Sequence, residues 1–226
     1  MEVNANYFII MTLRIEDASP FPYIIKSSYD FQFEKIRSKV DAHLAEADSF
    51  IKSKDLITLE KGGGVTTATI TNRPESTTLP PHKWEEFEDF NKNFLRKCGG
   101  KVWDLFDYEP TRPRTINGSW INVHPKGGYT ASHHHHGCPL AIVCYLHVPE
   151  GSGRLLIKNP MDMYTHALPI REDYFDSDKN RMWRPVEVKT NDVLFFPGYL
   201  EHKTEINKTD EKRYIMSINI SVPVSI

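Results

Sequence analysis

The spacing of apolar residues changes along the chain, and the first clear pattern is helical. In residues 31–53 the apolar positions recur every three or four residues; they are Phe33, Ile36, Val40, Leu44, Ala47 and Ile51. This spacing places them on one face of an amphipathic helix, for which Asp30 is a candidate N-cap. We expect this face to pack against the core of the protein.

A second helical pattern follows the pair Pro80-Pro81. Its apolar side is formed by Trp84, Phe87, Phe90 or Asn91, Phe94, Cys98 and Val102. The pair Gly99-Gly100 predicts a kink or a break, because glycine is unfavourable inside a helix. Before the first helix, residues 1–26 predict one or two strands, with a strand at 7–13 and a proline-containing turn at 19–22.

From residue 119 onward, short runs of strand-forming residues alternate with turn residues. This pattern is typical of an antiparallel sandwich or barrel. The predicted strands are 119–124, 130–136, 140–148, 153–158, 185–189, 193–197, 200–206 and 213–222. They predict a cupin-like double-stranded β-helix, or jelly roll, so the fold class is mainly β with flanking helices. Residues 160–184 are expected to form a long insertion over the mouth of the barrel.

The length and composition are those of one globular domain. At 226 residues the chain can bury a sizeable core. We expect residues 1–110 to supply the N-terminal strands and supporting helices, and residues 111–226 to form the jelly-roll core. Lysine plus arginine (28) nearly balances aspartate plus glutamate (30), which gives a formal charge of −2. Such a balance supplies no general attraction for nucleic acid or for an anionic membrane.

Two features predict a soluble, cytoplasmic protein without a membrane partner. The three cysteines, Cys98, Cys138 and Cys144, contain no C-x-x-C pair, so neither a disulfide framework nor a zinc ribbon is indicated. The apolar stretch at 7–13 has no basic region before it and is too short to span a bilayer. The sequence leaves the oligomeric state open, with a homodimer as one option.

The candidate chemistry begins with four consecutive histidines at positions 133–136. In a strand, His133 and His135 point to one face and the other two point to the opposite face. Two imidazoles on one face can bind a single metal ion, and His202 in a later predicted strand offers a third. Arg213 follows that histidine on the last strand. This layout is typical of a non-haem iron site with a clamp for an anionic cosubstrate.

Further motifs accompany the histidines in a fixed order. They are Ser119-Trp120-Ile121-Asn122, a shortened form of Ser-x-Trp-x-Asn, then Gly128-Tyr129, His133-His134-His135, the strand and turn from Val143 to Gly153, Phe196-Pro197-Gly198-Tyr199-Leu200-Glu201-His202, and Arg213 with Ser217 and Asn219. With this order and spacing, about residues 80–222 resemble the 2-oxoglutarate and Fe(II)-dependent oxygenases. The pattern is most similar to a branch of that superfamily with His-x-His at the metal site.

The resemblance implies Fe(II) and 2-oxoglutarate as cofactors and assigns roles to several residues. Arg213 would neutralise the distal carboxylate of 2-oxoglutarate, since its guanidinium offers a bidentate fork. Tyr145 resembles the tyrosine that helps to bind the same cosubstrate in prolyl-hydroxylase-like members, although an ordinary core aromatic is an equal alternative. Asn122 and Tyr129 are the remaining candidates for cosubstrate binding.

The resemblance places His133 and His202 among the metal ligands and leaves the third ligand open. The superfamily usually shows His-x-Asp or His-x-Glu, whereas this chain has His135 in that place. The alternatives are His135 itself, a carboxylate from elsewhere such as Glu201 or Asp162, and a shifted register that uses His134 and His136. We favour His135, because it lies on the required face, whereas Glu201 is adjacent to His202 and should point the other way.

The expected function is a non-haem Fe(II) and 2-oxoglutarate-dependent oxygenase that hydroxylates an unidentified substrate with release of succinate and CO2. No catalytic residue beyond the metal ligands is expected. One rival is a cupin-like three-histidine metal dioxygenase without 2-oxoglutarate, in which Arg213 would be structural. The other is a non-catalytic jelly-roll binding module, and an open coordination face at the metal distinguishes an enzyme from it.

Overall fold

The computed structural model describes residues 14–16, 24–72, 77–160 and 182–222. The strands of its larger sheet are β1 (Arg14–Glu16), β2 (Ile24–Ser28), β4 (Val65–Thr66), β5 (Thr115–His124), β7 (Leu140–His147), β10 (Asp192–Phe196) and β12 (Arg213–Ser221). The smaller sheet contains β8 (Leu155–Lys158), β9 (Trp183–Val186) and β11 (His202–Thr204). A short pair is formed by β3 (Glu60–Lys61) and β6 (Tyr129–Thr130).

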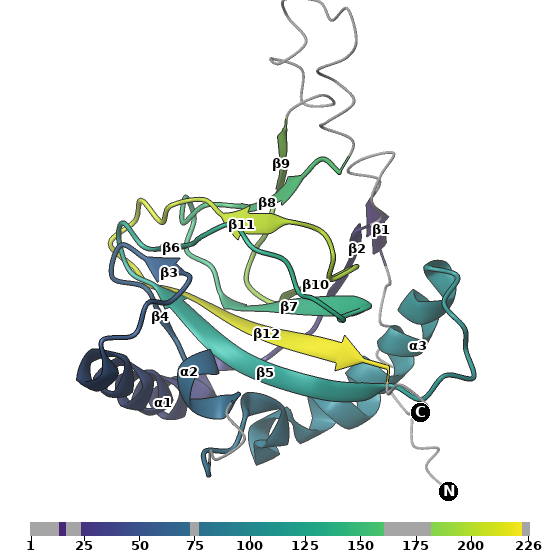
Figure 1. Ribbon diagram of the computed structural model, residues 1–226, viewed down its shortest axis with the longest axis horizontal. Helices are drawn as coiled ribbons and strands as arrows, with labels where there is room; N and C mark the ends of the chain where they lie inside the picture. Colours follow the sequence, from purple (N-terminus) through teal and green to yellow (C-terminus); the bar gives the residue numbers. More distant parts are fainter. Residues whose placement is uncertain (1–13, 17–23, 73–76, 161–181, 223–226) are drawn as a thin grey trace, which may run out of the picture.

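The two sheets face each other as a double-stranded β-helix, as the strand pattern predicts. Within the described residues, the strand order is β1-β2-β10-β7-β12-β5-β4 in the larger sheet and β11-β8-β9 in the smaller one. The pairs within both sheets are antiparallel. Figure 1 shows the helices on one side of the larger sheet and the smaller sheet on the other. The larger sheet is therefore covered on both faces, which explains why β7 is apolar along nearly its whole length.

The alternation of side chains on β12 determines which residues face the space between the sheets. Tyr214 and Met216 belong to the core on the helix side, whereas Ile215 belongs to the core between the sheets. Because faces alternate along a strand, Arg213 lies on the same face as Ile215. The register pairs Ile215 with Asn122 on β5 and with Tyr145 on β7. Several of the predicted cosubstrate residues are thereby placed on adjacent strands.

The first helix, α1 (Phe33–Lys54), agrees with the predicted helix 31–53 to within two residues. The prediction of Asp30 as its N-cap is wrong. Gln32 occupies the N-cap with a left-handed backbone, and it makes no side-chain capping hydrogen bond. The Asp30 carboxylate instead accepts a hydrogen bond from the Gln32 amide at 3.0 Å, which forms a local turn before the helix begins.

The second helical region is more irregular than a single helix. It consists of 3-10 turns at Pro81–Lys83 and Glu85–Phe87, a π-helical segment at Phe90–Leu95, and α3 (Arg96–Leu105). The predicted break at Gly99-Gly100 is wrong, because α3 continues through both glycines. Its buried side chains Cys98, Val102 and Trp103 hold it against the sheet core. The short helix α2 (Ala68–Thr71) packs near α1. Within the described part of the chain, no helix is long and apolar enough to cross a membrane.

Most predicted strands overlap the observed ones, with one informative exception. The strand expected at 130–136 ends at Thr130, and beyond it His133 forms only an isolated bridge with His202. The predicted strand 185–189 overlaps β9 only at residues 185 and 186. The strand at 7–13, the turn at 19–22 and most of the insertion at 160–184 lie outside the described residues.

Candidate metal centre

Three histidines from two segments converge between the sheets. His133 and His135 follow β6, and His202 begins β11. One ring nitrogen of each lies within 4.8 Å of the others. The ring centroids of His133 and His202 are 4.2 Å apart, and the His135 ring lies 5.1 Å from the first and 5.2 Å from the second. Three imidazoles at this spacing can meet at one metal ion.

Backbone carbonyls fix which nitrogen of two rings is free to bind a metal. Nδ1 of His133 lies 2.9 Å from the Ala131 carbonyl oxygen, and Nδ1 of His202 lies 2.8 Å from that of Leu200. A carbonyl oxygen only accepts hydrogen bonds, so Nδ1 carries the proton in both rings. The lone pair is then on Nε2, and the hydrogen bond at Nδ1 orients each ring as is usual for metal-binding histidines.

The third ring, His135, is held by different partners. Its backbone amide donates to the Gly198 carbonyl at 2.8 Å, and its Nδ1 lies 3.3 Å from the Asn219 amide nitrogen. The Asn219 oxygen is buried and has no hydrogen-bond partner among the described residues. Because the oxygen and nitrogen of an asparagine amide are assigned from their partners, a turn of this amide offers His135 an acceptor. A protonated Nδ1 would then leave Nε2 free in this ring as well.

Burial keeps the three imidazoles neutral. It lowers the pKa of His133 and of His202, and it lowers the pKa of His135 to about 4. The neutral form is the one that binds a metal, because a protonated nitrogen has no lone pair to share. At neutral pH the site is therefore ready to bind a cation without first losing protons.

The alternative ligands are not brought to this cluster. The Glu201 carboxylate instead accepts hydrogen bonds from Ser132 at 2.6 Å and Lys158 at 2.8 Å. His134 and His136 are exposed, and their rings contact each other edge to face with centroids 4.3 Å apart. Asp162 lies outside the described residues. Among the residues that the structure describes, no carboxylate joins the three histidines.

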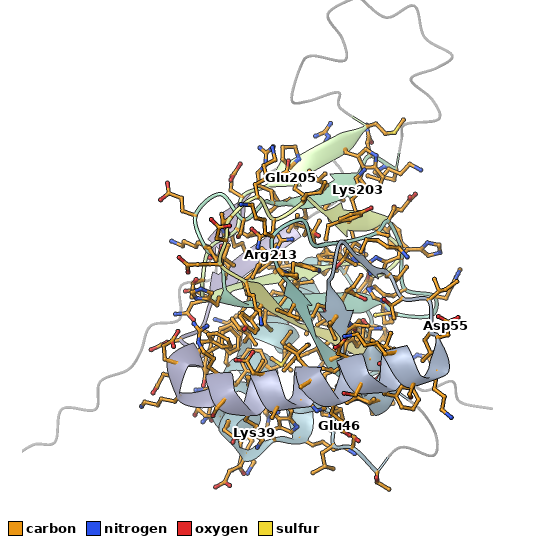
Figure 2. The ribbon with its side chains drawn as sticks, turned by 90° about the vertical axis from the view of Figure 1, so that its left-hand side faces the viewer. Lys39, Glu46, Asp55, Lys203, Glu205 and Arg213 are labelled. Carbon is orange, nitrogen blue, oxygen red and sulfur yellow. The ribbon has the colours of Figure 1, made fainter. Side chains whose placement is uncertain are left out.

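Arg213 is buried between the sheets, with 1% of its surface exposed, and its hydrogen bonds go to the protein. Nη1 donates to the carbonyls of Ser152 and Gly153, and Nη2 donates to the carbonyl of Glu205 at 3.0 Å. Nε and Nη2 also reach Nδ1 of His124, at 3.3 and 3.0 Å. All five N–H groups of the guanidinium thus face acceptors. Figure 2 shows Arg213 in the interior, below Glu205 and above α1.

Residues 118–219 match the family described as "Putative 2OG-Fe(II) oxygenase". The match covers somewhat less than half of the chain, and over this segment the chain is similar to the 2OG-Fe(II) oxygenases. The matched segment runs from β5 into β12 and contains the three histidines and Arg213. The description of this family names 2-oxoglutarate and Fe(II), the two cofactors that the sequence motifs also indicate.

Solved structures of 2OG-Fe(II) oxygenases share this fold. An oxidoreductase of the 2OG-Fe(II) oxygenase family from Burkholderia pseudomallei aligns over 81% of this chain and 76% of its own, with 13% identity and a TM-score of 0.50. The viral collagen prolyl hydroxylase vCPH from Paramecium Bursaria Chlorella virus-1, solved as a 2OG complex, aligns over 89% of this chain and 98% of its own, with 13% identity and a TM-score of 0.51. A search of the curated proteins gives no match.

The residues predicted to bind the cosubstrate of a 2OG-Fe(II) oxygenase are only partly brought together. The Tyr145 hydroxyl and the Asn122 carbonyl oxygen are buried and have no hydrogen-bond partner in the described structure. Burial raises the pKa of Tyr145, whereas the positive charge of Arg213 opposes the shift. Unsatisfied buried polar atoms are costly, which is the pattern expected where a ligand supplies the partner. Tyr129 lines a separate cavity of 980 Å³ together with Arg154.

Two buried residues that the sequence did not single out extend the network of Arg213. His124 Nε2 lies 2.9 Å from the Thr130 hydroxyl, and that hydroxyl lies 3.5 Å from the carboxyl of Glu60. Burial and the charge of Arg213 lower the pKa of His124 to about 3, so its ring is neutral and donates from Nε2. Burial raises the pKa of Glu60 to about 7. His124 could have been found from the sequence, because it alternates with Asn122 and so lies on the same face of the strand. No sequence feature pointed to Glu60.

Proposed function

We propose that this protein is an Fe(II) and 2-oxoglutarate-dependent oxygenase that hydroxylates its substrate, with His133, His135 and His202 as the iron ligands. The observation that carries the proposal is the meeting of three neutral imidazoles, one buried and two half-buried, with ligand nitrogens within 4.8 Å of one another; in two of them Nδ1 is hydrogen-bonded to a carbonyl. Fe(II) accepts imidazole ligands, and three on one face leave positions open for other ligands. When bound, Fe(II) activates O2, and substrate, O2 and 2-oxoglutarate are converted to alcohol, succinate and CO2.

The chain's own residues prepare this site in two ways. The carbonyls of Ala131 and Leu200 hold two imidazole rings in the tautomer that leaves Nε2 available. A neutral imidazole at His135, in place of the usual carboxylate, leaves the bound metal with one more unit of positive charge. A more positive centre attracts an anionic cosubstrate more strongly.

The proposed cosubstrate contacts are the Tyr145 hydroxyl, the Asn122 side chain and the charge of Arg213. Since the N–H groups of Arg213 already face protein acceptors, we assign the direct hydrogen bond to the hydroxyl of Tyr145. The guanidinium contributes its charge from beside this hydroxyl. This division of roles differs from a bidentate arginine clamp and predicts different effects for the two substitutions.

The proposal is tested by measuring succinate formed from 2-oxoglutarate by the iron-loaded protein under O2. We expect succinate to form only with iron, to be lost in His202→Ala, and to persist in His134→Ala, the matched control on the exposed face. Uncoupled turnover is slow in the absence of the true substrate, so calorimetry of 2-oxoglutarate binding accompanies the assay. If neither succinate formation nor 2-oxoglutarate binding were detected, the result would favour a three-histidine dioxygenase without 2-oxoglutarate or a binding module.

A further inference from the structure

A cavity of 390 Å³ opens beside two of the three proposed ligands, His133 and His135, and its lining has a distinctive composition. His133 and His135 form one wall, and Trp120 lies in the lining as well. The side chains of Ile57 and Leu59 also line it and are 94% and 44% exposed, so its rim is apolar. A volume of this size is within the range of small-molecule sites. The cavity is therefore large enough for a substrate next to the metal centre.

Glu60 carries the only carboxyl among the described lining residues, and the described lining contains no lysine or arginine. Its side chain is buried, with 8% of the residue exposed, and Thr130 is its only side-chain hydrogen-bond partner in the described structure. The adjacent Lys61 turns away and donates to the Thr58 carbonyl at 2.8 Å. A buried carboxylate without a paired cation is costly, so the cavity lacks a positive group that a ligand could supply.

The Glu60 carboxyl is also held in place from the far side of the barrel. Arg213 donates to His124, His124 donates to the Thr130 hydroxyl, and this hydroxyl can donate to Glu60. Within this network, each group donates to the next one, from the guanidinium of Arg213 to the carboxyl of Glu60. Such a network orients a carboxyl that would otherwise rotate freely at a cavity wall.

We propose that Glu60 binds a basic nitrogen of the substrate, so that the substrate class is a small organic cation with an apolar body. This inference rests on the proposed function, because it places the substrate beside the metal centre. A carboxylate with an aromatic ring nearby, here Trp120, is suited to an ammonium group. The apolar rim at Ile57 and Leu59 is suited to the hydrocarbon part.

The same composition argues against 2-oxoglutarate as the occupant of this cavity. The cosubstrate is a dianion, and the lining offers it a carboxyl and no basic side chain among the described residues. Of the proposed cosubstrate contacts, Arg213 and Tyr145 do not line the cavity, whereas Asn122 does. Asn122 would thus lie at the boundary between the substrate and the cosubstrate.

The test measures binding without turnover, in the zinc-loaded protein, by calorimetry with three probes of equal length: hexylamine, 1-hexanol and hexanoate. We expect hexylamine to bind wild type with a Kd at least tenfold lower than that of 1-hexanol, and hexanoate to bind weakest. Glu60→Gln should reduce the amine preference to threefold or less. Glu46→Gln is the matched control, because it removes the same charge from an exposed position on α1 that Figure 2 shows pointing away from the sheets.

Glu60→Asp keeps the charge and is expected to retain an amine preference, which also covers the case in which Glu60→Gln does not fold. An undiminished preference in Glu60→Gln, or no preference in wild type, would overturn the inference. Since zinc supports no oxygen chemistry, this result is independent of the succinate assay. Succinate formation without amine preference would refute the substrate class alone, whereas amine preference with neither succinate formation nor 2-oxoglutarate binding would refute the oxygenase alone.

Discussion

His133 and His202, which are far apart in the sequence, hold each other through two backbone hydrogen bonds. The His133 amide donates to the His202 carbonyl at 3.0 Å, and the reverse bond is 2.8 Å long. These bonds involve no side-chain atoms, so the positions of two proposed metal ligands are fixed by the backbone. The site is thus preorganised for a metal, and its rings can be removed without removing the contact that joins the segments.

The first prediction follows from this separation of backbone and side chain. His133→Ala and His202→Ala should each lose metal affinity by roughly a hundredfold or more, since even residues that only support ligands contribute 10–100-fold. Both variants should keep the circular dichroism spectrum of wild type. Competition between the protein and a chelator for Co(II) measures the affinity. An equal loss in His134→Ala, whose ring faces away, would contradict the assignment.

The second prediction concerns Asn219, which lies beside Nδ1 of His135. Asn219→Leu removes the proposed acceptor while keeping a side chain of similar size, so the His135 ring loses its orientation. We expect metal affinity to fall by roughly 10–100-fold, the range for lost support of a metal ligand. The same chelator competition checks it, with Ser217→Ala as a control on the same strand. Unchanged affinity would show that Asn219 does not support the ligand.

The third prediction separates Tyr145 from Arg213. The Tyr145 hydroxyl has no partner in the described structure, so Tyr145→Phe should leave the free energy of unfolding unchanged or raise it. The same variant should weaken 2-oxoglutarate binding roughly tenfold or more, because a hydrogen bond to a charged group is lost. Arg213→Met should instead destabilise the protein by roughly 3–5 kcal/mol, since it removes a buried charge and its acceptors lose their donors.

Calorimetry with the Mn(II)-loaded protein and urea unfolding together decide this third case. If Tyr145→Phe bound 2-oxoglutarate as wild type does, the hydroxyl would have no role in the cosubstrate site. If Arg213→Met kept full stability, the hydrogen bonds of its guanidinium would not support the fold.

The fourth prediction is a pH dependence of stability caused by Glu60. Its pKa in the folded protein is raised to about 7, above that of an exposed carboxyl, so between about pH 4.5 and 7 the folded state binds the proton more strongly. Its contribution to stability is therefore lost as the pH rises through this window. Glu60→Gln should gain stability relative to wild type between pH 5 and pH 8, by up to about 3 kcal/mol.

Urea unfolding of the metal-free protein at both pH values measures this gain. His124 and His135 act in the opposite direction, because their pKa values are lowered to about 3 and about 4. Both histidines are present in wild type and in the variant, so their contributions cancel in the difference between the two free energies of unfolding. A difference between the two proteins that does not change with pH would show that Glu60 titrates normally.

The strands were predictable because their signals are local. Turn residues and alternating apolar positions mark each strand of the jelly roll, and the spacing of His133 and His135 indicated that these two side chains share one face. The end of the strand at Thr130 was not predictable, because the sequence does not show where backbone pairing stops and a single bridge at His133 replaces it. The left-handed backbone at Gln32, which displaces the expected cap at Asp30, was not predictable either, because residues other than glycine rarely adopt it.

The surroundings of Arg213 were beyond the reach of the sequence for a different reason. Its acceptors are mostly backbone carbonyls, which every residue carries, so no motif marks them. Gly153 contributes to this arrangement because its backbone has a φ of +93° and a Cβ there would lie 3.1 Å from Nη1 of Arg213. Glu60 comes from a strand of two residues far from the barrel motifs, and only the fold brings it to the metal centre.

The most direct measurement is a crystal structure of the protein prepared without oxygen, with Fe(II) and 2-oxoglutarate bound. We expect iron bonded to Nε2 of His133, His135 and His202, with the distal carboxylate of 2-oxoglutarate within hydrogen-bond distance of the Tyr145 hydroxyl. Iron bonded to a carboxylate of the chain in place of His135, or 2-oxoglutarate bound beside Glu60 and away from Tyr145, would contradict this expectation.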